Sequence, residues 1–202
     1  MENEAEILEL VISDDDESGV EFISLVDQPA IEKTWQKFNK QQPLDFKFEI
    51  QNEEKRIVSG FFMVADLPIP RLNDVGEKFY VVFKKDTINK IVNKFFKQGY
   101  SNKINLMHDV DTEGVYVIES LIIDKERGIV APKGFEKTPD GSWWGSMRVE
   151  NEEIWNLIKE GKIKGFSVEG MFGQEKSRNI QEKIINKIRD VIRKYNINKI
   201  EK

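Results

Sequence analysis

The sequence predicts an α+β fold in which a mostly antiparallel, barrel-like sheet is accompanied by surrounding helices. Two observations lead to this class. Strand-length apolar segments outnumber amphipathic helical segments by about eight to three. Most of the predicted strands are also separated by turns and loops rather than by helices. No internal repeat interrupts this pattern.

The predicted strands are runs rich in Val, Ile and Phe that are bounded by turn-forming residues. They span residues 5–12, 20–26, 57–65, 79–83, 103–108, 115–124, 143–149 and 163–172, and a short alternating strand at 46–50 lies within a polar segment at 32–55. Residues 67–71 and 125–142 contain Pro and Gly and are predicted to be loops.

Three segments have the apolar periodicity of amphipathic helices. Asp86 is expected to cap a helix that Gly99 ends, and Asn151 is expected to cap a second helix that Gly161 ends. The third helix is predicted within residues 178–202, with a basic polar face. This last helix has two interpretations: it packs on the sheet, or it serves dimerisation or docking to a partner.

The elements group into three parts along the chain. Residues 1–56 hold N-terminal strands and a polar linker, residues 57–175 form the main body, and residues 176–202 form the amphipathic C-terminal helix. The total of 202 residues suits a single domain with a real core.

Composition excludes several classes of function. The net charge of −5 argues against general nucleic-acid binding, which needs a clustered basic surface. The absence of cysteine excludes disulfides, thiol catalysis and cysteine-based zinc sites. No apolar stretch approaches the roughly 20 residues that span a bilayer. The acidic N-terminus also lacks the pattern of a signal peptide, so an intracellular protein is expected.

The strongest chemical signal is a lone histidine combined with a serine between glycines. His108 is the single histidine of the chain, and Ser167 lies in the run Gly165–Gly170. An imidazole that takes the proton of a hydroxyl is the minimum requirement of a serine hydrolase. Each residue alone is more simply explained, since His108 suits a surface turn and Ser167 suits a bulge that packs closely against another element.

The segment around Ser167 differs from the nucleophile elbow of α/β-hydrolases, because Glu169 replaces the second glycine of that motif. In an alternating strand, Ser167 and Glu169 point to one face while Phe166 and Val168 point to the other. A hydroxyl and a carboxylate on one face of an apolar strand indicate a site, although an edge strand would give the same pattern.

Glu119 is a second candidate acid, because it is the only charge within an apolar strand. If a hairpin places His108 opposite Val115, Glu119 lies on the same face as His108. The imidazole would then partner a carboxylate whose desolvation is costly when it stands alone.

Two segments suggest metal sites, and neither site is preferred. Residues 14–19 resemble the start of an EF-hand loop, but Leu25 stands where the bidentate Glu is needed, so a solvated turn is expected. Residues 108–111 would allow a hard-ion site built from oxygen ligands. We expect no metal and no cofactor.

These motifs resemble those of the phage prohead, or capsid maturation, serine proteases, in particular the branch found in defective Bacillus prophages. The resemblance is carried by residues 19–31, 58–63, 80–83, 105–109, 117–120, 141–144, 154–155 and 161–170. Residues 1–18 and 175–202 lie outside it. The His108 and Ser167 blocks are specific in combination.

The resemblance implies an assemblin-like fold, similar to that of herpesvirus maturational proteases, with residues 57–175 as the protease core. It implies that Ser167 is the nucleophile and His108 the general base, with Glu119 and Glu169 as candidates for the third group. Residues 128–145 are expected to supply amides that bind the oxyanion.

The implied substrates and partners are phage scaffold and major capsid proteins, and the implied place of action is the host cytoplasm, inside the immature head. A homo-oligomer is expected. Two other functions stay open: a catalytically inactive head-assembly or scaffold-binding module on the same fold, and a structural protein of the mature head.

Overall fold

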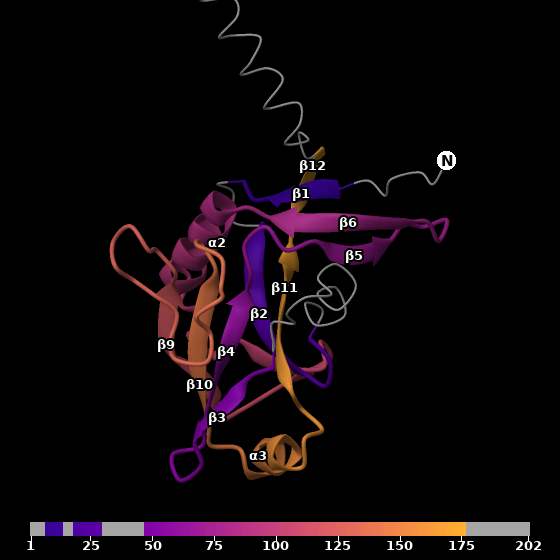
Figure 1. Ribbon diagram of the computed structural model, residues 1–202. Helices are drawn as coiled ribbons and strands as arrows, with labels where there is room; N and C mark the ends of the chain where they lie inside the picture. The colour runs from indigo at the N-terminus through magenta and orange to yellow at the C-terminus, as the bar shows by residue number, and fades with distance from the viewer. Residues whose placement is uncertain (1–6, 14–17, 30–46, 177–202) are drawn as a thin grey trace, which may run out of the picture.

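The computed structural model describes residues 7–13, 18–29 and 47–176, which form a mixed α+β structure made mainly of sheets. Its strands make three four-stranded sheets. Figure 1 shows one sheet running across one end of the molecule, with the long strands of the other two extending away from it. Within the described residues the sheets do not close into a barrel, so the barrel-like and assemblin-like parts of the predicted fold are not confirmed.

The first sheet lies across the end of the molecule and has the order β12-β1-β6-β5. Its strands are β12 (Gly173–Lys176), β1 (Ile7–Val11), β6 (Lys78–Phe83) and β5 (Ile69–Leu72). β1 and β6 are parallel, and the other neighbours are antiparallel. β5 overlaps residues 67–71, which the sequence predicts to be a loop, and its pairing with β6 makes a hairpin.

The second sheet has the order β3-β4-β10-β9 and is antiparallel throughout. Its strands are β3 (Glu49–Asn52), β4 (Ile57–Met63), β10 (Trp143–Val149) and β9 (Val115–Ile122). Trp143 and Phe62 from this sheet form the centre of the core, with ring centroids 4.9 Å apart in an edge-to-face arrangement.

The third sheet has the order β11-β2-β7-β8. Its strands are β11 (Gly165–Met171), β2 (Gly19–Val26), β7 (Ile104–Leu106) and β8 (Val110–Asp111). β2 is antiparallel to β11 and parallel to β7. The N-terminal strand β2 therefore lies between two strands from much later in the chain.

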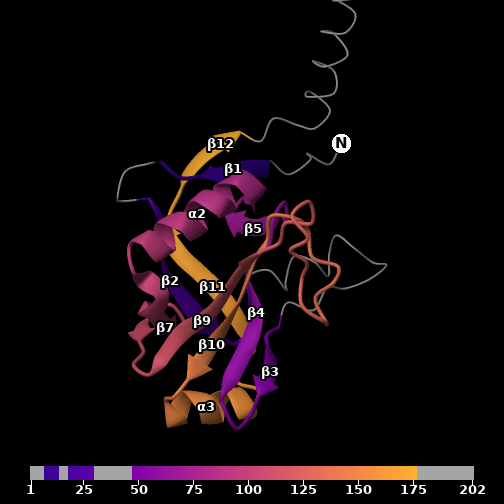
Figure 2. The same cartoon turned by 90° about the vertical axis from the view of Figure 1, so that its left-hand side faces the viewer.

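Two α-helices and one 3₁₀ turn complete the described structure: α2 (Lys85–Lys97), η1 (Tyr100–Asn102) and α3 (Glu152–Lys159). Both α-helices agree with the sequence prediction, although Asp86 lies in the first turn of α2 and not at its cap. Asn151 caps α3 by accepting a hydrogen bond from the Ile154 amide at 3.1 Å. α3 lies at the end opposite to β1 and β12 (Figures 1 and 2).

Three features of the sequence prediction fall outside the described residues. These are the helix within 178–202, the acidic turn at 14–17 and most of the polar segment at 32–55. The division into three parts along the chain stays a prediction.

Candidate active site

Three neighbouring strands of the third sheet place a row of polar residues side by side. Ser167 of β11 is opposite Ser24 of β2, and Ser24 is in turn opposite Asn105 of β7. Residues paired across adjacent strands point to the same face of a sheet. Ser24 and Asn105 are buried although both are polar, which requires partners for their side chains.

His108 reaches this row from the turn between β7 and β8. The turn closes with a hydrogen bond from the Asp109 amide to the Leu106 carbonyl at 3.1 Å. Its two central residues, Met107 and His108, have φ values of 54° and 63°. Positive φ at both central positions is characteristic of the type I′ turn that joins hairpin strands. A non-glycine pair in this region is strained and persists where the surrounding structure holds it.

Nδ1 of His108 has two partners. It lies 2.8 Å from the Ser24 hydroxyl and 3.2 Å from Oε2 of Glu169. The same carboxylate oxygen of Glu169 accepts a hydrogen bond from the Asn105 side-chain amide at 3.0 Å. Glu169 and His108 are each a little over 40% exposed, whereas Ser24 is fully buried. The imidazole is thus held on one edge by a buried hydroxyl and by a solvated carboxylate.

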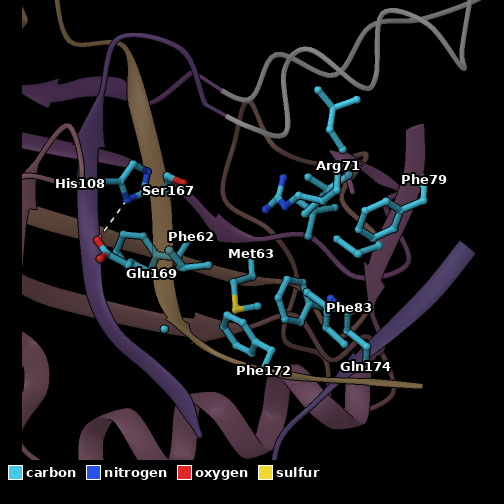
Figure 3. Close-up of a pocket in the computed structure, with 17 residues that line it drawn as sticks. Phe62, Met63, Arg71, Phe79, Phe83, His108, Ser167, Glu169, Phe172 and Gln174 are labelled. Atoms are coloured by element: carbon cyan, nitrogen blue, oxygen red, sulfur yellow. Dashed lines mark hydrogen bonds and ion pairs between the residues drawn. The ribbon is translucent and has the colours of Figure 1, made fainter. Parts of the chain in front are cut away.

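Ser167 lines the same cavity as His108. Figure 3 shows the side chain of Ser167 on the Nε2 side of the His108 ring, with Glu169 across the ring at Nδ1. Among the described residues no hydrogen bond joins Ser167 to His108. In enzymes without bound substrate such contacts are often long and tighten when substrate arrives.

The two glycines that flank Ser167 allow close packing. A Cβ atom at Gly165 would lie 2.1 Å from the ring of Pro29, and one at Gly170 would lie 1.8 Å from the carbonyl oxygen of Gly19. A register shift between Glu169 and Gly170 adds a bulge next to this contact. These glycines bring β11 against β2, which sets the position of Ser167.

Glu119 lies elsewhere in the molecule. It is on β9, opposite Ser146 of β10, and accepts a short hydrogen bond from the Ser146 hydroxyl. Ser146 also contacts the hydroxyl of Ser59, with an Oγ–Oγ distance of 2.6 Å. The structure therefore brings His108, Ser167 and Glu169 together and places Glu119 against two serines in the second sheet.

The hairpin expected between His108 and Val115 is wrong. The residues after His108 form β8, which pairs back on β7, with Asn105 opposite Asp111. β9 begins at Val115 and joins the second sheet instead. The physical reason is that the chain reverses earlier, in the connection of residues 107–109 that contains His108 itself.

Sequence reasoning missed Ser24. The available signal was weak: a lone hydroxyl in β2, where Ile23, Leu25 and Val26 are buried. Its importance comes from the pairing of β2 between β7 and β11, which local sequence does not encode.

A cavity of about 670 Å³ opens beside these residues, between β11 and the β5–β6 hairpin. His108, Ser167 and Glu169 are among its lining residues. None of residues 128–145 lines it, so the loop expected to bind an oxyanion does not border this cavity.

The described residues contain no cluster of three or more side chains that could together hold a metal ion. None of the described helices is long and apolar enough to cross a membrane.

A hydroxyl beside one nitrogen of an imidazole, with a carboxylate at the other nitrogen, is the arrangement of a serine hydrolase. Comparison with known families agrees with this class. A family model described as "Putative phage serine protease XkdF" matches residues 45–175, which is more than half of the chain, and the chain belongs to this family. This result confirms the resemblance to phage serine proteases. Neither the curated proteins nor the solved structures contain a match.

Proposed function

We propose that the protein is a serine endopeptidase that processes scaffold and capsid proteins during maturation of a phage head. The observation that carries this proposal is the convergence of His108, Ser167 and Glu169 at one end of a cavity in a chain of the phage serine protease family. The same family membership suits action inside the immature head.

In this mechanism Nε2 of His108 takes the proton of Ser167 as Oγ attacks the carbonyl carbon of the scissile peptide bond. The C–N bond then breaks, and the imidazolium gives its proton to the leaving amine. Water, activated by the same imidazole, attacks the acyl-enzyme and releases the second product. Glu169 accepts a hydrogen bond from protonated Nδ1, so it favours the tautomer in which Nε2 is free to accept a proton.

Ser24 fits this mechanism as a positioning residue. Its buried hydroxyl lies at 2.8 Å from Nδ1, closer than the carboxylate of Glu169, and restrains the plane of the imidazole. Asn105 restrains the side chain of Glu169 in a similar way, by donating a hydrogen bond to its carboxylate. Supporting groups of this kind keep reacting atoms within a few tenths of an ångström of their productive positions.

Ser24→Ala is expected to lower kcat by about tenfold with little change in KM, because the imidazole loses one restraint while the cavity is unchanged. Steady-state cleavage of a peptide substrate measures both constants. Ser13→Ala is a suitable control, since Ser13 is a serine of the N-terminal region that does not line the cavity. Equal kcat values for wild type and Ser24→Ala would remove Ser24 from the mechanism.

The proposed function is tested by co-expressing the protein with the scaffold and major capsid proteins encoded beside it. Intact masses are then compared between wild type and Ser167→Ala. New termini that appear with wild type alone support the protease and define its cleavage sites. If every partner remains full length with both proteins, the inactive assembly module becomes the better interpretation.

A further inference from the structure

The cavity extends well beyond His108 and Ser167, and its far part is apolar. The side chains there come from β4, from the β5–β6 hairpin and from the residue that joins β11 to β12. They include Phe62, Met63, Phe79, Val81, Phe83 and Phe172. Figure 3 shows Phe83, Phe172 and Met63 grouped on the side of the cavity away from His108. Such a surface suits apolar side chains of an extended peptide.

One cation lies within this apolar lining. Arg71 is on β5, and Figure 3 shows its guanidinium turned toward the end of the cavity that holds Ser167. Its one hydrogen bond among the described residues is from Nη1 to the carbonyl of Pro70, at 3.1 Å. None of the described carboxylates forms an ion pair with it.

The surroundings of Arg71 favour a carboxylate partner. Although Arg71 as a residue is exposed, loss of hydration where its side chain lies against the cavity lowers its pKa from the ordinary value. A guanidinium presents several N–H donors in a fixed planar fork, which matches a carboxylate. The carboxylate of Glu169, which also lines the cavity, already accepts hydrogen bonds from Asn105 and His108.

We propose that Arg71 is a specificity-determining residue that binds an Asp or Glu side chain of the substrate, while the apolar part of the cavity binds a neighbouring apolar side chain. This inference rests on the proposed endopeptidase function, because it assigns the cavity beside Ser167 to substrate. The recognised class of substrate is a peptide in which an acidic residue stands at a fixed distance from the scissile bond, next to a hydrophobic residue.

Binding can be tested without cleavage. The full chain with Ser167→Ala is used to select peptides from a random library displayed on phage through their C-termini, so that every carboxylate offered is a side chain. The selection is repeated with Ser167→Ala combined with Arg71→Gln. We expect an acidic residue at one fixed position next to an apolar one in the first selection and its loss in the second. Selected peptides without such an acid, identical peptides from both proteins, or no enrichment would each overturn the proposal.

Cleavage gives the second test. Two peptides that carry the selected sequence and differ by Glu or Gln at the acidic position are compared. We expect wild type to cleave the Glu peptide at least about tenfold faster in kcat/KM. With Arg71→Gln the ratio of the kcat/KM values for the Glu and Gln peptides should fall to about one. Arg71→Glu should prefer a Lys peptide.

A matched control separates the charge from its position. Arg127→Gln removes an exposed arginine that pairs with Asp124 and does not line the cavity, and it should retain the full preference. Cleavage without any preference for the acid would overturn the role of Arg71 and leave the protease intact. Acid selection by the Ser167→Ala protein, together with no cleavage by wild type, would support Arg71 as a binding residue and contradict the endopeptidase function.

Discussion

His108→Ala is expected to slow the reaction of Ser167 by about 10⁶-fold, as loss of the general base does in enzymes where the serine, imidazole and acid act as a unit. An isolated hydroxyl is a weak nucleophile at neutral pH because its proton is held tightly. His108 is the only histidine in the chain, so no second imidazole can take over its role.

The measurement uses a fluorophosphonate probe, which forms a covalent bond with an activated serine. Mass spectrometry of the labelled wild type should locate the adduct at Ser167, and His108→Ala should show almost none. Asp109→Ala is the matched control, because Asp109 is an exposed neighbour in the same turn and closes that turn through its backbone amide. Equal labelling of wild type and His108→Ala would refute the proposed role of the imidazole.

Glu169→Gln is expected to lower kcat by about 10⁴-fold, the loss seen when the acid of a serine triad becomes an amide. The substitution keeps the size of the side chain but removes its charge. The Gln amide group can then donate to Nδ1, which favours the tautomer that carries its proton on Nε2. In that tautomer His108 has no lone pair on the side of Ser167.

Glu119→Gln provides the comparison, since Glu119 bonds to Ser146 in another sheet. Its kcat is expected to stay within about threefold of wild type, because a surface substitution distant from the reacting groups changes little. Circular dichroism spectra should show that both variants remain folded. A large loss with Glu119→Gln and a small loss with Glu169→Gln would reverse the assignment of the third group.

The periodic features of the sequence predicted much of the structure. Apolar runs located most of the strands, and Asn151 marked the start of α3 by the side-chain bond that caps it. The alternation of β11 correctly placed Ser167 and Glu169 on one face, because Glu169 and Ser24, the residue opposite Ser167, both contact His108. These features depend on neighbours close in sequence, so they can be read directly from it.

The features that the sequence did not predict depend on strand pairing between distant parts of the chain and on backbone strain. His108 was expected in a strand, but Met107 and His108 take positive φ, which glycine or asparagine would have signalled. Nothing local distinguishes Ser24 from another strand serine, because its contact with His108 follows from the parallel pairing of β2 with β7. Glu119 and Glu169 were equally good candidates for the third group, because the partner of each carboxylate also depends on long-range strand pairing.

The placement of β2 between β7 and β11 has a consequence for the newly made polypeptide. The ribosome produces Ser24 first, His108 later and Ser167 last, and the row closes only when β11 adds to the free edge of β2. A chain still in synthesis therefore carries His108 and the buried Ser24 without Ser167, the proposed nucleophile. Under the proposed function, proteolytic capacity therefore begins only when β11 is complete, and an unfinished copy could not cut neighbouring proteins.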